Sequence, residues 1–134
     1  MIKGIDHIAI ASEDIDGAQL LFRDLLGLDL RGRETVQDQR ISTDIYDTEN
    51  AHIEVMEPTA EDSPISGFLE RRGEGIHHIC FKVENLPEML QRLSEAGVEL
   101  IDREPRRGVG GKQIAFLHPR STHGVLIELS ETRE

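Results

Sequence analysis

Two histidines and two glutamates occupy matching positions in two segments of the chain that resemble each other. His7 follows Asp6 in an Ile-rich run, and His78 stands in a similar run 71 positions later. Glu54 and Glu128 each lie between aliphatic residues, 74 positions apart. If the two segments fold alike and pack side by side, the four side chains converge from four strands, as ligands of a divalent metal do. The first chemistry that the sequence predicts is therefore a metal centre built from a repeat.

Alternation along the predicted strands separates these four side chains from the core. Each is flanked by aliphatic or aromatic residues, such as Ile8 beside His7 and Val55 beside Glu54. Because successive side chains of a strand point to opposite faces, the ligands share one face and the apolar residues the other. Taken singly, a strand histidine or glutamate is more often structural or solvent-facing. Four at repeat-equivalent positions favour the metal.

The elements that position these residues follow one pattern twice. In the first half we expect strands at 5–11, 28–35, 40–47 and 52–57, with a helix after the first strand that Gly27 ends. The helix is indicated by apolar residues at helical spacing, namely Ala18, Leu21, Phe22, Leu25 and Leu26. In the second half we expect a helix at 86–96 and strands at 76–83, 98–104, 113–118 and 124–130.

This order predicts an α+β fold of two tandem βαβββ modules that form a cupped, barrel-like mixed sheet with the helices outside. We expect a single domain over residues 1–134, with module one at about 4–58, a linker helix within about 59–74 and module two at about 75–131. The four candidate ligands would then lie inside the cup.

Composition excludes several classes of function. The net charge is −11, from 26 acidic and 15 basic residues, so nucleic acid and anionic membranes are not expected as partners. The single cysteine, Cys80, cannot form an internal disulfide and is expected to be a small buried apolar residue. The first residues show no targeting pattern. We therefore expect a cytoplasmic protein.

Three stretches carry a resemblance that covers essentially the whole chain. Asp6-His7, residues 61–79 and residues 116–128 resemble methylmalonyl-CoA epimerases, within the vicinal-oxygen-chelate (glyoxalase/bleomycin-resistance/dioxygenase) superfamily. The resemblance implies a coenzyme A thioester as substrate and a homodimer. It also implies a set of metal ligands: His7, Glu54, His78 and Glu128.

The implied reaction fits such a centre. Removing the hydrogen between a thioester and a carboxylate leaves an enolate, which a divalent metal stabilises while it orients the substrate. Inversion then needs two acid/base groups on opposite sides. Glu128 is the first candidate and Glu54 is another. In some relatives a glutamate serves on the third strand of the first module, but the matching residue here is Thr43, a poor base. The adjacent Asp44 should point to the other face.

The metal itself is not specified. A mixed nitrogen and oxygen donor set favours Co, Mn, Fe, Ni or Zn over Ca, and Mg is a further candidate. The Gly-rich segment 106–112 contains two arginines and a lysine, and it could hold the coenzyme A phosphates or be a solvated hairpin.

Two other functions are open. The ligand pattern also resembles glyoxalase I, which isomerises a glutathione hemithioacetal through a metal-bound enediolate, although residues 61–79 and 116–128 argue for the epimerase. A metal-free module that binds small molecules is the third reading, because the same fold also serves that purpose. Such a module needs no converging ligands.

Overall fold

The computed structural model describes residues 1–132, and the chain clusters into two compact units. The N-terminal unit comprises residues 7–77, and the C-terminal unit comprises residues 1–6 together with the chain from residue 78 onward. The order strand, helix and three strands occurs twice along the chain. The predicted α+β class with two tandem βαβββ modules is confirmed.

Four strands form the sheet of the N-terminal unit in the order β2-β3-β4-β1. From His7 onward β1 runs parallel to β4, whereas β2, β3 and β4 pair antiparallel with their neighbours in sequence. The bounds of these strands are Ile2–Ala11 for β1, Asp29–Val36 for β2, Ile41–Asp47 for β3 and His52–Pro58 for β4.

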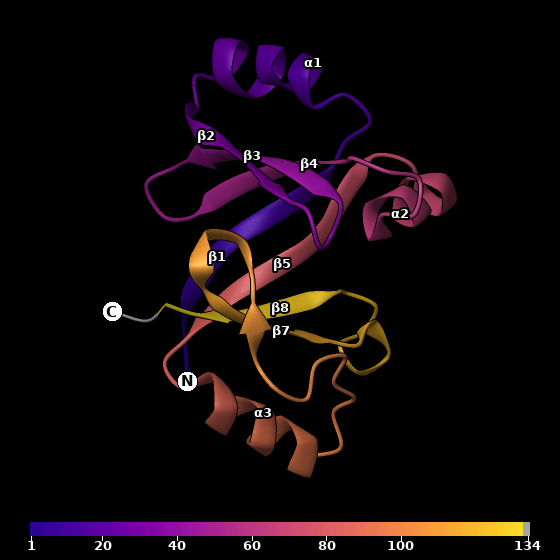
Figure 1. Ribbon diagram of the computed structural model, residues 1–134. Helices are drawn as coiled ribbons and strands as arrows, with labels where there is room; N and C mark the ends of the chain where they lie inside the picture. Colours follow the sequence, from indigo (N-terminus) through magenta and orange to yellow (C-terminus); the bar gives the residue numbers. More distant parts are fainter. Residues whose placement is uncertain (133–134) are drawn as a thin grey trace. The chain divides into compact units, whose positions relative to one another are not determined.

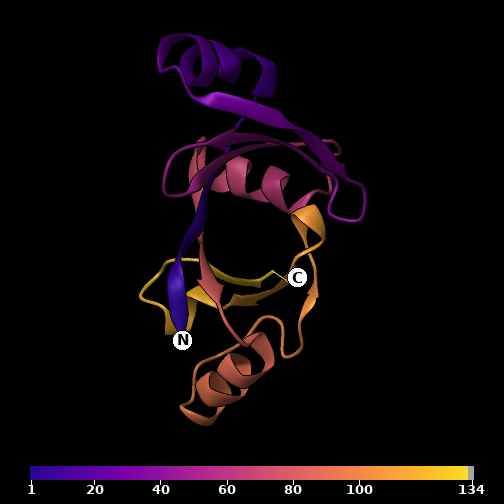
Figure 2. The same cartoon turned by 90° about the vertical axis from the view of Figure 1, so that its left-hand side faces the viewer.

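Helices cover both faces of this sheet, and Figure 2 shows α1 and α2 on opposite sides of the strands. Helix α2 (Pro64–Arg72) buries Ile65 and Leu69 against Ala9 and Met56 of one face. On the other face, Ile15 of α1 joins a cluster with two strand residues, Tyr46 and Val55. Desolvation raises the pKa of the Tyr46 phenol.

The first helical segment differs from the regular helix that we predicted. Helix α1 (Ile15–Gln19) is capped at its N-terminus by Asp14, whose side chain accepts a hydrogen bond from Gly17 N at 2.9 Å. It passes into a π-helical segment, η1 (Leu20–Leu25), in which the Leu26 amide donates to Leu21 O. Ala18 and Phe22 pack against the cluster on the sheet. Four leucines are exposed, namely Leu20, Leu21, Leu25 and Leu26.

The sheet of the C-terminal unit has the order β5-β8-β7-β6, with β5 parallel to β8 and the other neighbours antiparallel. Helix α3 (Leu86–Glu95), which Figure 1 shows on one side of β7 and β8, buries Leu86 and Leu90 in a cluster with Leu129. No helix in residues 1–132 is long and apolar enough to cross a membrane. The remaining bounds are Gly75–Val83 for β5, Arg106–Arg107 for β6, Val109–Gly111 for η2, Gln113–Leu117 for β7, Pro119–Ser121 for η3 and Ile127–Glu131 for β8.

Two predicted strands of this unit need correction. The strand expected at 98–104 is absent from the described residues, where only Leu100 forms an isolated bridge. The reason is Asp102, whose carboxylate accepts the Phe116 amide at 2.8 Å and so replaces a backbone carbonyl of the sheet. The strand expected at 124–130 begins three residues later, at Ile127, because a turn precedes it: Gly124 N donates to Pro119 O at 2.9 Å.

Candidate functional site

The N-terminal unit places His7 and Glu54 on one face of adjacent strands. Ala9 of β1 is level with Glu54 of β4, and His7 is level with His52, so both candidate ligands point to the same side. His7 Nδ1 lies 3.2 Å from Glu54 Oε2, and the two side chains are 7% and 8% exposed. The sequence prediction that these two residues share a face is confirmed.

The C-terminal unit contains the equivalent pair. His78 Nε2 on β5 lies 2.8 Å from Glu128 Oε1 on β8, and both side chains are buried. Phe116 stands directly opposite Glu128 on β7. Its ring meets the His78 imidazole edge to face, with 5.3 Å between the centroids. The aromatic ring thus packs against the imidazole of the pair.

Each pair has donor atoms suited to a metal. Two ligands in adjacent positions around a first-row divalent ion, each at about 2.1 Å from it, lie about 3 Å from one another. The two nitrogen-to-oxygen distances, 3.2 Å and 2.8 Å, match this separation. Buried carboxylates and imidazoles are costly to leave without a partner ion or hydrogen bond. Both units therefore contain residues that could serve as metal ligands.

The two other acid/base candidates of the N-terminal unit lie on opposite faces. Thr43 of β3 is level with Met56 of β4, and Ile45 with Glu54, so Thr43 points to the Glu54 side. Asp44 points to the α1 side, as alternation predicts. There it accepts hydrogen bonds from Arg33 Nε at 2.7 Å and Gln19 Nε2 at 2.9 Å. These bonds make Asp44 a structural residue.

The bonds of Arg33 extend this structural network. Hydrogen bonding to Asp44 and then to Asp16 raises the pKa of the Arg33 guanidinium. Arg33 therefore stays charged and ties β2 to β3 and to α1.

Sequence reasoning missed one carboxylate. Glu34 of β2 is level with Thr43 of β3 and therefore points to the Glu54 side of the sheet, where it is half-buried. Only the strand register shows the direction of Glu34, because the charged stretch of sequence around it is typical of a solvent-exposed segment. The register makes Glu34 a further candidate for proton transfer.

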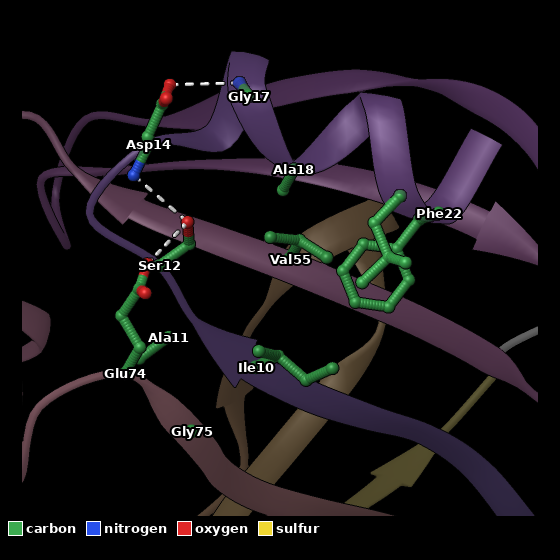
Figure 3. Close-up of a pocket in the computed structure, with 11 residues that line it drawn as sticks. Ile10, Ala11, Ser12, Asp14, Gly17, Ala18, Phe22, Val55, Glu74 and Gly75 are labelled. Carbon is green, nitrogen blue, oxygen red and sulfur yellow. Dashed lines mark hydrogen bonds between the residues drawn. The ribbon is translucent and has the colours of Figure 1, made fainter. Parts of the chain in front are cut away.

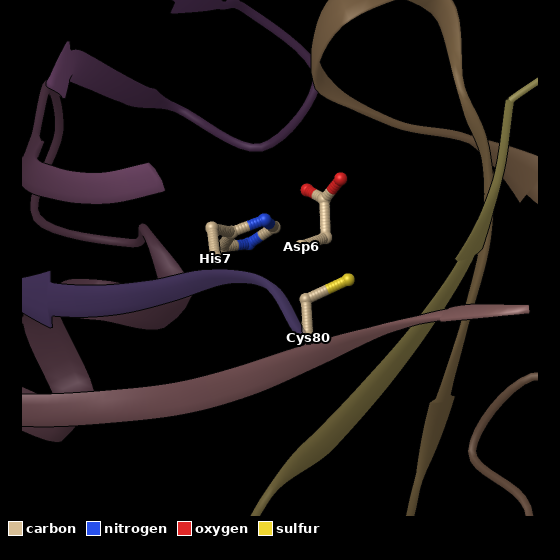
Figure 4. Close-up of side chains that lie close together, drawn as sticks. All are labelled: Asp6, His7 and Cys80. Carbon is tan, nitrogen blue, oxygen red and sulfur yellow. The ribbon is translucent and has the colours of Figure 1, made fainter. Parts of the chain in front are cut away.

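Cys80 is buried on the ligand face of the C-terminal unit, level with Glu128. This confirms the prediction of a buried thiol. Figure 4 shows its side chain leaving β5, and those of Asp6 and His7 leaving β1. Asp6 is almost wholly buried and accepts a hydrogen bond from Lys112 Nζ at 2.6 Å.

The Gly-rich segment 106–112 is only partly available for phosphate binding. Lys112 is paired with Asp6. Arg106 donates to Asp102 at 3.0 Å and stacks over Phe116. Arg107 is exposed and is thus the basic group that could best meet an anion.

A pocket of about 510 Å³ lies elsewhere, on the α1 side of the N-terminal unit. Its walls include Ile10, Val55, Ala18 and Phe22, and Figure 3 shows Ser12 and Glu74 at its polar end. These strand residues alternate with His7 and Glu54, so the pocket opens on the face away from the candidate ligands.

The fold is that of a known family. The chain matches the glyoxalase/bleomycin resistance protein/dioxygenase superfamily over residues 6–116, and it belongs to this superfamily. It is 38% identical to an ethylmalonyl-CoA/methylmalonyl-CoA epimerase of Cereibacter sphaeroides. The alignment extends over 133 residues, which are 98% of this chain and 99% of the relative.

Two solved structures extend the likeness. Methylmalonyl-CoA epimerase from Mycobacterium tuberculosis is 38% identical, with a TM-score of 0.94 over 99% of this chain and 90% of that one. A variant of the Streptomyces coelicolor methylmalonyl-CoA epimerase in complex with 2-nitronate-propionyl-CoA is 34% identical. Its TM-score is 0.92, and the match covers 98% of this chain and 96% of that one. The resemblance to methylmalonyl-CoA epimerases that the sequence predicts is confirmed.

Proposed function

We propose that the protein is a metal-dependent methylmalonyl-CoA epimerase. The observation that carries the proposal is the pair of equivalent histidine–carboxylate contacts, His7 with Glu54 and His78 with Glu128. Support comes from full-length similarity to proteins named as epimerases of this substrate, one of them solved with a coenzyme A thioester analogue. We include in the proposal a divalent ion, whose identity is open.

The metal ligands of the proposal are His7, Glu54, His78 and Glu128. When bound, the ion supplies positive charge that stabilises the enolate left by proton removal and orients the substrate. The protein must still hold both carboxylates ionised and both imidazoles neutral. Binding of the ion therefore displaces any proton shared within each pair.

Proton transfer is assigned to Glu128 first and to Glu54 second. Glu128 is buried beside His78 and is level with Phe116, and a carboxylate positioned next to the reacting carbon can act as a general base. Glu54 lies in the other unit and supplies a second carboxylate, as inversion requires. Asp44 takes no part, because it points to the α1 side.

The assembly and location form part of the same proposal. We expect a homodimer that binds its substrate through the coenzyme A thioester, with Arg107 as a contact for the phosphates. We expect it in the cytoplasm, where the buried thiol of Cys80 stays reduced.

Solvent deuterium exchange tests the proposal. The protein is stripped with a chelator, divided, and resupplied with Co or Mn or left bare, and methylmalonyl-CoA in D₂O is followed by NMR. We expect deuterium at the α-carbon and loss of stereochemical purity only in the resupplied samples. Metal binding without exchange would reject the epimerase and direct attention to glutathione hemithioacetals. Absence of metal binding would favour a binding module.

A further inference from the structure

The C-terminal unit has a polar pocket at one end of its sheet, with a volume of about 520 Å³. Two lysines line this pocket, Lys3 from β1 and Lys82 from β5, and both are exposed to solvent. The hydroxyl residues Ser130 and Thr132 line it as well. Ammonium groups and hydroxyls are donors that suit the oxygens of a phosphate.

Strand register places the lysine of β5 on the ligand face of this unit. Lys82 is level with Ser130 of β8, two residues beyond the level of Cys80 and Glu128. Because alternate residues of a strand share a face, Lys82 points to the same side as His78, which lies four residues or about 13 Å back along β5. A ligand held at the His78 pair can therefore extend along the sheet to the pocket.

The N-terminal unit shows how the equivalent place is filled there. The offset of 71 residues between the two candidate histidine ligands also relates Lys3 to Glu74, since 74 minus 3 is 71. The Glu74 carboxylate accepts hydrogen bonds from Ser12 Oγ at 3.3 Å and from the Glu13 amide at 2.9 Å (Figure 3). Within residues 1–132, the ammonium groups of Lys3 and Lys82 form neither a hydrogen bond nor an ion pair. The repeat thus holds a bonded anion in one unit and unpaired cations in the other.

The carboxylates of the pocket do not neutralise these cations by direct contact. Glu131 Oε1 accepts the Leu86 amide at 2.9 Å, which commits that oxygen to the start of α3. Glu84 is exposed and forms no ion pair among the residues that the structure describes. Two ammonium groups at one pocket repel each other, and a bound anion relieves that repulsion. In a chain with a net charge of −11, such a local positive site is needed to receive an anionic ligand.

We propose that this pocket binds the pyrophosphate of the coenzyme A thioester. The inference rests on the proposed function, which supplies a ligand of that class. The pyrophosphate carries two ionised phosphates, one for each ammonium group. The flexible pantetheine arm joins it to the thioester and spans the separation of about 13 Å between His78 and Lys82. The phosphate on the ribose is left for Arg107, the exposed arginine of the Gly-rich segment.

Three thioesters with the same acyl group separate the phosphates. Malonyl-CoA carries all of them, malonyl-dephospho-CoA lacks only the ribose phosphate, and S-malonylpantetheine lacks every phosphate. We would measure the affinity of the metal-loaded protein for each thioester by calorimetry. The variants are Lys3→Gln, Lys82→Gln and the double variant, which remove charge, and Lys82→Arg, which keeps it.

Arg92→Gln is the control for net charge. Arg92 lies on α3 of the same unit, is exposed and does not line the pocket. Its replacement removes the same charge as each lysine variant does. All three affinities should stay within about twofold of the wild type, because exposed charges outside the binding site are screened by salt.

In the double variant we expect malonyl-CoA and malonyl-dephospho-CoA to bind about 10- to 100-fold more weakly, with the affinity for S-malonylpantetheine unchanged. Each single glutamine variant should show a smaller loss of the same kind, and Lys82→Arg should bind about as the wild type does. The KM for methylmalonyl-CoA should rise more than kcat falls. The melting temperature without ligand should stay that of the wild type, because both lysines are exposed.

Other outcomes overturn the inference and separate it from the proposed function. Wild-type affinities in the double variant would reject the pocket, and an equal loss for S-malonylpantetheine would show that the lysines do not act on phosphate. A loss confined to malonyl-CoA would assign the pocket to the ribose phosphate instead. A lysine-dependent affinity without deuterium exchange into methylmalonyl-CoA would reject the epimerase and keep the pocket. A wild type that binds none of the three thioesters would reject both.

Discussion

The two units present the same pair of candidate ligands, a histidine and a glutamate, on differently supported sheets. In the C-terminal unit, α3 buries Leu86 and Leu90 beneath the strands, each worth about 1.5–3 kcal/mol of apolar burial. In the N-terminal unit, α1 buries Ile15, while Leu25 of η1 is 71% exposed. The ligand pair therefore does not depend on how the helix packs. It depends on strand register, which is the feature that the two units share.

The ligand faces differ as well. Glu128 stands opposite the aromatic ring of Phe116 and beside the His78 imidazole. Glu54 stands next to the row that contains Thr43 and Glu34. Glu128 therefore lies against an aromatic ring, whereas Glu54 lies beside a polar row. Four experiments can break or sharpen this comparison of the two units.

The largest effect is expected from replacing the carboxylates one at a time. Glu128→Gln and Glu54→Gln should each lower the rate of epimerisation by about 10²- to 10⁴-fold, since each removes one acid/base group. Each variant should still exchange deuterium into one epimer, and the two variants should act on opposite epimers. Circular dichroism and NMR of the recovered thioester give the readout.

Full epimerisation by Glu54→Gln would place the second group elsewhere. Glu34, level with Thr43 on the same face, would then be the next carboxylate to replace.

The helices give the next largest effect. Leu90→Ala should lower the free energy of unfolding by about 2–5 kcal/mol, because Leu90 is buried in the α3 cluster. The matched change Leu25→Ala should cost less than about 0.5 kcal/mol, because Leu25 is exposed. Urea unfolding of both variants measures the difference. A comparable loss in Leu25→Ala would show that another surface covers the exposed leucines in solution.

A smaller loss of folding stability should follow from Asp44→Asn, which weakens the hydrogen bonds from Arg33 and Gln19 on the α1 side. We expect about 1–3 kcal/mol lower stability. The rate of deuterium exchange at saturating metal should stay unchanged, because Asp44 points away from Glu54. A lower rate of deuterium exchange in a variant that is still fully folded would contradict the conclusion that Asp44 and Glu54 lie on opposite faces of the sheet.

The smallest effect concerns the irregular edge of the C-terminal unit. Asp102→Ala removes the acceptor of the Phe116 amide and should cost about 1 kcal/mol. Hydrogen exchange at that amide should become faster, while Asp102→Asn, which keeps an acceptor oxygen, should protect it. An unchanged exchange rate in the alanine variant would mean that the carboxylate does not hold this strand.

Sequence patterns were sufficient for the strand faces of the four candidate ligands but not for the residues around them. Alternation of His7, Glu54, His78 and Glu128 with aliphatic residues predicts their faces, because a strand has only two. The π turn of η1 escaped prediction, since its leucines have the spacing of an ordinary helix. The interruption of the strand near residue 100 was not predicted either. The Asp102 carboxylate accepts a hydrogen bond from the Phe116 amide, 14 positions away, and such a bond leaves no local pattern in the sequence. The position of Glu34 beside Thr43 needed the register of two strands.

The central claim is that His7, Glu54, His78 and Glu128 bind one divalent metal ion, and metal titration tests it most directly. Apo wild-type protein, His7→Ala and His78→Ala would be titrated with Co, with calorimetry and elemental analysis giving affinity and stoichiometry. The account predicts one ion per chain in the wild type and an affinity lowered by about 100-fold or more in each variant. Two ions per wild-type chain, or wild-type affinity in either variant, would contradict it.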